Sequence, residues 1–167
     1  MPHTDLTAER LRELLDYDPE TGAFHWLVPP RGSNGSNVEA GWERKDGYRS
    51  ITVDKGKFLA HRLAWLYMTG AWPTDTIDHK DGNPRNNRWA NLRAASRSQN
   101  MANQRTRASN VTQLKGVSFS ARDKRWFGRL VADGQLHSSG YLNCPAAAHL
   151  WYITEANKRF GEFARVS

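Results

Sequence analysis

The sequence contains one cysteine, Cys144, among its 167 residues. A single cysteine excludes an internal disulfide and any zinc site made of several thiolates, and it suits a reducing compartment. Apolar runs near the ~20 residues that span a bilayer are also missing, and the first residues lack the charged-then-apolar order of a secretion signal. These absences predict a cytoplasmic protein that does not enter a membrane.

Hydrophobic residues are scarce, at 38% of the chain, and the mean hydropathy of −0.76 is strongly polar. The aromatic residues offset this scarcity, because 7 Trp, 6 Phe and 5 Tyr are enough to fill small cores. A chain of this length forms one ordinary domain or two small ones. The composition therefore predicts folded domains rather than a disordered chain.

Positive charge is concentrated in the middle of the chain. Residues 79–129 contain 12 Lys and Arg side chains against two acidic ones, Asp81 and Asp123, which is a net charge of +10, whereas the whole chain carries +7. A field of this kind most often neutralises phosphates, and the interleaved Trp, Asn and Gly residues favour that use. The other interpretation is a solvated basic surface or a basic linker.

The spacing of apolar residues predicts mixed secondary structure in the first two thirds of the chain. A helix begins after the N-cap Thr7 and ends in a turn at residues 18–22. Ser96 and Gln99 have the spacing of a capping box, which starts a further helix. Between these helices the pattern predicts strands at 23–28, 48–53, 76–79 and 92–94, a loop at 29–41, a hairpin turn at 54–57 and a helix at 60–69.

The last third is predicted to be a separate small unit that follows a basic linker at 105–113. Asp133 and Gly134 form a hairpin signal between two strands. Pro145 suits the first turn of a helix, and Gly161 suits its end. The pattern predicts strands at 115–120, 125–132 and 136–142 and a helix at 145–160.

Four polar residues have a spacing that suits a metal-dependent hydrolase. Asp78 and His79 are adjacent, so their side chains point to opposite faces of a strand. An Asp carboxylate and the amide of Asn91 or Asn100 offer the oxygen ligands that Mg²⁺ prefers. Histidine titrates near neutral pH, so an imidazole is able to deprotonate water, and an Asn carbonyl on its other nitrogen would fix the tautomer. Asn-rich loops are also common turn formers, so spacing alone leaves a purely structural role open.

Residues 77–93 (IDHKDGNPRNNRWANLR) and 98–103 (SQNMAN) resemble the core of HNH endonucleases. The most similar branch is that of the intron-borne and free-standing phage homing endonucleases. Further upstream, the resemblance continues in residues 17–22 (YDPETG), 46–48 (DGY) and 60–64 (AHRLA). Most of the chain from residue 6 to residue 105 is covered.

The resemblance implies a ββα-metal active site with one divalent ion, Mg²⁺ or Mn²⁺. His79 would be the general base that activates water, and Asn91 would orient His79 through its ring. Asp78 and Asn100 would hold the metal against the scissile phosphate. The products would be 5′-phosphate and 3′-hydroxyl ends, with one strand nicked per active site.

One position departs from the family pattern. Many relatives have a third histidine three residues before the ligand Asn, where this chain has Arg97. The intact Asn100 favours an Asn-ligand variant, and the alternatives are that Arg97 weakens metal binding or contacts a phosphate. His61 and Asn103 are candidate supports, and for His61 a role in the core is preferred over a phosphate contact. The predicted DNA contacts are Arg85, Arg88, Arg93, Arg97, Arg105, Arg107, Arg122, Lys124, Arg125 and Arg129.

The last third of the chain resembles the Apetala-type, or ethylene-response-factor, DNA-binding domain. The resemblance implies a three-stranded antiparallel sheet that lies in the major groove, with a helix on its other face. Strand alternation then turns Trp126, Gly128 and Leu130 towards the helix and Arg129 towards DNA. The first hairpin carries basic residues that fit phosphate contacts, or it is an exposed turn without a role. The matching residues are KGV at 115–117, RWFGRL at 125–130, SGYL at 139–142, AAA at 146–148 and FG at 160–161.

The sequence therefore predicts an α+β protein with a nuclease domain at 1–104 (core 76–104), a linker at 105–113 and a DNA-binding domain at 114–167. The predicted function is a metal-dependent, site-directed DNA endonuclease of the homing type, a monomer unless a dimer makes double-strand breaks. It would work in the cytoplasm of the host cell if a phage encodes it. Two other interpretations stay open: a DNA-binding regulator that keeps the nuclease fold without cleavage, and a nonspecific or RNA-directed nuclease, for which a separate DNA-reading sheet would be unnecessary.

Overall fold

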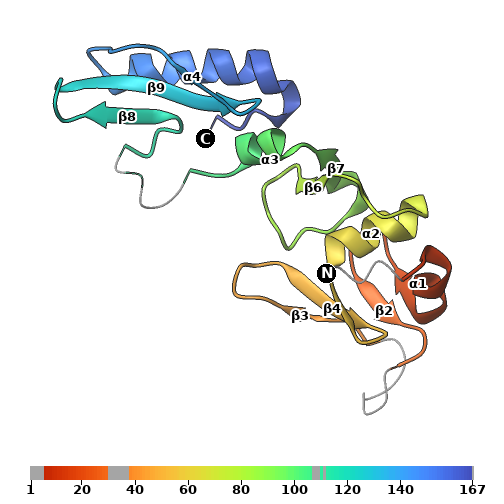
Figure 1. Cartoon of the computed structure of the whole chain (residues 1–167). Coiled ribbons are helices and arrows are strands. Elements are labelled where there is room, and N and C mark those ends of the chain that lie inside the picture. The colour runs from red at the N-terminus through yellow and green to blue at the C-terminus, as the bar shows by residue number, and fades with distance from the viewer. Residues whose placement is uncertain (1–5, 30–37, 107–109, 111, 167) are drawn as a thin grey trace. The chain divides into compact units, whose positions relative to one another are not determined.

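The computed structural model describes residues 6–29, 38–106, 110 and 112–166 (Figure 1). Helices are separated by runs of short strands along the chain, such as those at residues 15–59 and 117–138, which confirms the predicted α+β class. The chain divides into two compact units, Met1–Ala94 and Ala95–Ser167, and each is described by itself. The predicted boundaries of the nuclease domain, linker and DNA-binding domain stay a prediction.

The first unit combines two α-helices with three small sheets, β1–β2, β3–β4–β5 and β6–β7. The helix α2 confirms the prediction, whereas α1 is shorter than predicted, because it ends at Leu14 and residues 15–17 form strand β1 in place of its last turn. Strand β3 and the 3₁₀ helix η1 are additional to the prediction. In chain order the elements are α1 (Ala8–Leu14), β1 (Leu15–Tyr17), β2 (Phe24–Trp26), β3 (Trp42–Glu43), β4 (Arg49–Val53), β5 (Gly56–Leu59), α2 (Ala60–Thr69), β6 (Thr76–His79), η1 (Trp89–Asn91) and β7 (Leu92–Ala95).

Local side-chain chemistry explains where these elements begin and turn. The Thr7 hydroxyl accepts a hydrogen bond from the Arg10 N–H at 3.2 Å, which caps α1 as predicted. Asp54 and Lys55 have φ angles of 44° and 68°, and these left-handed residues form the predicted hairpin turn between β4 and β5. Of the predicted loop at 29–41, residues 30–37 lie outside the described part of the chain.

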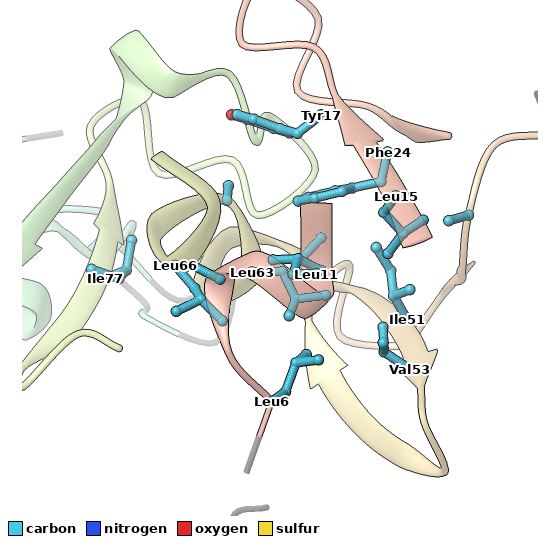
Figure 2. Close-up of a cluster of buried hydrophobic side chains, with 14 of the residues drawn as sticks. Leu6, Leu11, Leu15, Tyr17, Phe24, Ile51, Val53, Leu63, Leu66 and Ile77 are labelled. Carbon is cyan, nitrogen blue, oxygen red and sulfur yellow. The ribbon is translucent and has the colours of Figure 1, made fainter. Parts of the chain in front are cut away.

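A buried hydrophobic cluster joins the elements of the first unit (Figure 2). Leu11 of α1, Phe24 of β2 and Leu63 of α2 belong to it, and all three side chains are completely buried. Burial of one such side chain contributes ~1.5–3 kcal/mol. The cluster also includes Ile77 of β6, so the strand that carries the candidate Asp78–His79 pair is anchored in this core.

The second unit is a three-stranded antiparallel sheet, in the order β8–β9–β10, packed on a long helix (Figure 1). This arrangement confirms the sheet and helix that the sequence predicts. The helix α3 at its start has the predicted capping box between Ser96 and Gln99. The elements of the second unit are α3 (Arg97–Asn103), β8 (Val117–Ser120), β9 (Arg125–Ala132), β10 (Gln135–Ser138), α4 (Pro145–Phe160) and the 3₁₀ helix η2 (Gly161–Phe163).

The sheet approaches α4 closely at Gly128. A Cβ added there would lie 2.5 Å from the Trp151 ring and 2.6 Å from the Ala148 carbonyl oxygen, so only glycine fits. Leu130 is buried on the same side of β9, whereas Arg129 between them is exposed. The predicted alternation, with one face of β9 on the helix and Arg129 on the other face, matches this arrangement.

The strand predicted at 136–142 is shorter in the structure, because β10 ends at Ser138. The Ser139 N–H still donates to the Gly128 carbonyl at 3.0 Å, but the Gly128 N–H donates to the Ser139 hydroxyl, at 2.9 Å, in place of a backbone carbonyl. Beyond this point the chain next pairs with the sheet at Leu142, as an isolated bridge to Trp126. Of the predicted linker, residues 107–109 and 111 lie outside the described part of the chain. Every helix among the described residues is too short or too polar to cross a membrane.

Candidate functional site

Asp78 and His79 lie at the end of β6, and only 4% and 5% of their surfaces are exposed. The Asp78 carboxylate accepts a hydrogen bond at its Oδ2 from Arg93 Nε on the neighbouring strand β7, at 3.0 Å. A buried carboxylate is expensive to desolvate unless it is paired. Arg93 therefore places a positive charge beside the buried Asp78 carboxylate and offsets the cost of burying it.

The His79 ring lies against the amide of Asn87, in the loop between β6 and η1. The distance from His79 Nε2 to Asn87 Oδ1 is 3.1 Å. Asn87 itself is buried, and its Nδ2 donates to the Arg85 carbonyl at 3.4 Å. Asn87 belongs to the motif that carries the family resemblance. Its role is not predicted from the sequence, because its spacing does not distinguish it from the other asparagines of that loop.

Two aromatic rings pack around His79. The His61 ring meets the His79 ring edge-on with 5.1 Å between centroids, and the Tyr48 ring lies 6.0 Å away. Burial, assisted by the charges of His79 and Arg62, lowers the pKa of His61 to about 3, so this ring is neutral at neutral pH. A buried neutral ring favours the support role for His61 over a phosphate contact.

Asn91 does not make the ring contact that the sequence analysis expects. Its Oδ1 accepts the Asp81 N–H at 3.1 Å, and its Nδ2 donates to Asp81 Oδ1 and to the Asn86 carbonyl at 3.0 and 2.8 Å. The backbone position of Asn91 explains this difference. Its carbonyl accepts the N–H of Lys80, the residue after His79, so its side chain lies beside Asp81 and Asn86. Asn91 therefore braces the loop, and Asn87 contacts the ring.

Asn100, the second predicted metal ligand, lies on α3 in the second unit and is half-buried. Asn103 follows one turn later and is buried, with 5% of its surface exposed. Arg97 is exposed in the first turn of the same helix. Their predicted roles as ligand, support and phosphate contact stay predictions.

The donor chemistry fits the predicted divalent ion. Asp78 offers a carboxylate and Asn100 an amide oxygen. Mg²⁺ usually keeps several waters and is held by one or two carboxylates together with substrate phosphates, so a sparse set of oxygen ligands suits it. Among the described residues, no three His, Cys, Asp or Glu side chains gather into a metal cluster.

Most of the predicted DNA contacts are exposed. Arg93 differs from the others, because 10% of its side chain is exposed and it pairs with Asp78. Arg107 lies outside the described residues, and Arg85 pairs with Glu43 at the surface. The exposed basic residues of this set are Arg85, Arg88, Arg97, Arg105, Arg122, Lys124, Arg125 and Arg129.

The outer face of the C-terminal sheet, on the side away from α4, includes Arg129 together with polar and apolar neighbours. Arg129 stands opposite Ser138 in the register of β9 and β10, and Val131 stands opposite Leu136. All four residues are exposed. Arginine is the side chain that most often reads guanine, and apolar side chains contact thymine methyl groups, so this face has the chemistry of a base-reading surface.

Comparisons with known proteins identify the class of protein. The sequence profile described as HNH endonuclease matches residues 58–102, which include β6, β7 and most of α3. Protein 3.8 of Escherichia phage T7 is 36% identical over 109 residues, which are 63% of this chain and 87% of that protein. DNA endonuclease I-HmuI of Bacillus phage SP01 is 35% identical over 80 residues, 44% of this chain and 46% of that enzyme. The chain belongs to the HNH endonuclease family.

A solved structure of the HNH homing endonuclease I-HmuI, described as showing DNA binding and cleavage, also aligns with the chain. The alignment covers 88% of this chain and 85% of the other, with 23% identity and a TM-score of 0.44. The resemblance of the last third to the Apetala-type domain stays a prediction.

Proposed function

We propose that the chain is a metal-dependent DNA endonuclease of the homing type, which cuts at a chosen site. The observation that carries this proposal is the buried Asp78–His79 pair at the end of β6, inside the segment that matches the HNH family. DNA is supported as the substrate by the name of the relative I-HmuI, a DNA endonuclease, and by the basic charge of residues 79–129.

In the proposed reaction, His79 takes a proton from the attacking water. The water oxygen bonds to phosphorus as the bond from phosphorus to the 3′ oxygen breaks. The 3′ oxygen then takes a proton from a solvent water, which leaves 5′-phosphate and 3′-hydroxyl ends. A positioned general base contributes ~10²–10⁴-fold to such a rate. His61 and Tyr48 pack against the ring and limit its movement.

Asp78 and Asn100 are the residues that would hold the divalent ion, Mg²⁺ or Mn²⁺. When bound, the ion stabilises the negative charge that develops on the phosphate and on the leaving oxygen. Arg93 has a separate role, because its hydrogen bond to Asp78 Oδ2 holds that carboxylate in one orientation.

DNA binding is proposed for both units. Exposed arginines of the first unit and of α3 would contact phosphates near the cut, which positions the duplex without selecting a sequence. Arg122, Lys124 and Arg125 at the β8–β9 turn would make further phosphate contacts. Arg129 on the outer face of the sheet would reach base edges and supply the choice of site.

One site per chain cuts one strand, so the monomer is proposed to nick. A double-strand break needs a second copy of the chain or a second event on the other strand. Nicked circles and linear plasmid separate these two modes on a gel.

A plasmid library that carries random inserts tests both the DNA target sequence and the chemistry of the cleaved ends. Wild-type protein and Asp78→Asn are incubated with the library at low salt in Mg²⁺ or Mn²⁺, and the ends of cut molecules are sequenced and tested for ligation. The proposal predicts one enriched site with ligatable ends for wild type and binding without cutting for Asp78→Asn. Cuts at unrelated sequences would show a nonspecific nuclease, and binding without cuts by both proteins would show a regulator.

A further inference from the structure

Asn87 is a buried polar residue that has no assigned part in the reaction. Only 3% of its surface is exposed, which is less than for Asp78 or His79. A buried amide has to satisfy both its oxygen and its nitrogen with hydrogen bonds. Its two partners, the His79 ring and the Arg85 carbonyl, therefore determine how the amide is oriented.

The orientation of this amide identifies which nitrogen of His79 carries the proton. The Arg85 carbonyl can only accept, so Asn87 presents its NH₂ group to Arg85 at 3.4 Å and its Oδ1 to His79 at 3.1 Å. Because Oδ1 is an acceptor, the His79 Nε2 beside it must donate an N–H. In a neutral ring the lone pair then belongs to Nδ1, the nitrogen that accepts a proton from water.

The backbone of Asn87 is held by the hairpin β1–β2, some seventy residues earlier in the chain. The Tyr17 hydroxyl donates to the Asn87 carbonyl at 2.7 Å in the interior of the unit. Burial raises the pKa of Tyr17, so this hydroxyl keeps its proton. The ring of Tyr17 is itself fixed in the core, with its centroid 4.7 Å from that of Phe24.

The turn of the same hairpin also lies directly against the backbone of Asn87. Gly22 has a φ of +79°, and a Cβ at this position would lie 2.4 Å from the carbonyl carbon of Asn87 and 2.5 Å from the Arg88 nitrogen. The Pro19 carbonyl accepts the Trp89 N–H at 3.0 Å. The turn therefore contacts the backbone from Asn87 to Trp89 and leaves it little freedom to shift.

We propose that Asn87 is the positioning residue that fixes the His79 ring in its Nε2–H tautomer, and that the β1–β2 hairpin, through Tyr17 and Gly22, fixes Asn87. The inference rests on the proposed role of His79 as the general base. It extends the active site to a hairpin outside residues 58–102, the segment that matches the family. Asn87 acts through His79 and does not touch the reacting atoms.

The test is a ¹⁵N NMR spectrum of the imidazole nitrogens in the full chain, at a pH where imidazole is neutral. Wild type is expected to show a protonated Nε2 and an unprotonated Nδ1 at His79. Asn87→Ala is expected to move both nitrogen shifts towards the average of the two tautomers, whereas Asn87→Asp, which keeps an acceptor oxygen, restores the wild-type pattern. Asn83→Ala is the matched control, because Asn83 lies in the same loop and its Oδ1 accepts the Arg85 N–H instead.

Three results would overturn the proposal: a proton on Nδ1 in wild type, unchanged shifts in Asn87→Ala, or a pattern in Asn87→Asp that differs from wild type. Tyr17→Phe provides a second, milder variant if Asn87→Ala does not fold. Its loss of the bond to the Asn87 carbonyl is expected to broaden or shift the His79 signals, and a spectrum identical to wild type would contradict the role of the hairpin. The readout needs no cleavage, so a failure of the nuclease proposal appears in the plasmid assay and a failure of this one appears in the spectrum.

Discussion

Arg93 Nε donates to Asp78 Oδ2 across the β6–β7 sheet at 3.0 Å, and 10% and 5% of the two side chains are exposed. The predicted metal ligand is thus already half of a buried ion pair. Loss of one partner of such a pair leaves an uncompensated charge in the interior. The cost of burying the Asp78 carboxylate is therefore offset by a positive charge from the neighbouring strand.

Arg93→Ala should lower the free energy of unfolding by about 3–5 kcal/mol, because it strands the buried Asp78 carboxylate. Arg88→Ala removes an exposed arginine from the same region and should change stability by less than about 0.5 kcal/mol. Urea unfolding of both variants measures the difference. Equal free energies of unfolding for Arg93→Ala and Arg88→Ala would show that the Arg93–Asp78 ion pair does not stabilise the fold by this amount.

Gly22→Ala should destabilise the first unit strongly, because the new Cβ would overlap the backbone of Asn87 and Arg88. Gly134→Ala is the matched control, with a similar φ of +76° and no described atom within 4 Å of the added Cβ. Backbone strain alone should cost Gly134→Ala about 1–2 kcal/mol, and Gly22→Ala should lose at least a further ~2 kcal/mol. Thermal or urea unfolding tests this, and similar losses for the two variants would count against the close contact at Gly22.

Much of the fold is encoded locally, and this part is predictable from sequence. The capping box of α3, Pro145 at the first turn of α4 and Gly70 after α2 each determine an end of a helix through neighbouring residues. The role of Asn87 has no local signal. Its ring contact crosses eight residues of an Asn-rich loop, and the bond from Tyr17 that holds it crosses seventy. The contacts that the packed β1–β2 hairpin makes with Asn87 distinguish it from Asn91, and the sequence pattern does not show them.

Tyr17→Phe should lower the free energy of unfolding by about 1–3 kcal/mol, since it leaves the buried Asn87 carbonyl without the hydroxyl donor. Tyr67→Phe is a suitable control, because the Tyr67 hydroxyl donates to Asp16 at 3.3 Å in an exposed position. The control should lose less than about 1 kcal/mol. Equal losses in urea unfolding would indicate that the Tyr17 bond is replaced by another group.

The stability of the first unit should fall in acid because of His61. Burial lowers the pKa of His61 to about 3 in the folded chain, whereas an unfolded His titrates near ~6.5. Below about pH 6.5 the unfolded chain therefore binds a proton that the folded chain does not, and stability is lost as the pH falls towards about 3. The contribution between pH 7 and pH 5 is about 2 kcal/mol.

Unfolding of wild type and His61→Phe at several pH values measures this effect. The variant should lose less stability than wild type between neutral pH and about pH 5. Parallel stability curves for the two proteins would contradict the assignment of the acid effect to His61.

Arg129→Ala should weaken binding to the cognate site by about 1–3 kcal/mol and relax the choice of base there, if its guanidinium reads a base edge. Arg125→Ala should weaken binding to all sequences alike and reduce the slope of log affinity against log salt by about 1. Binding titrations at several salt concentrations separate these two behaviours. An equal effect of Arg129→Ala on cognate and unrelated DNA would remove it from the base-reading role.

The central claim is that His79 performs metal-dependent hydrolysis, and conversion of supercoiled plasmid tests it most directly. Wild type and His79→Ala are compared at low salt with Mg²⁺, Mn²⁺ or EDTA, on a plasmid that contains the site recovered from the library. The account predicts open circles for wild type with either metal, none with EDTA, and a rate at least ~10²-fold lower for His79→Ala. Cleavage that persists in EDTA, or that is as fast in His79→Ala as in wild type, would contradict it.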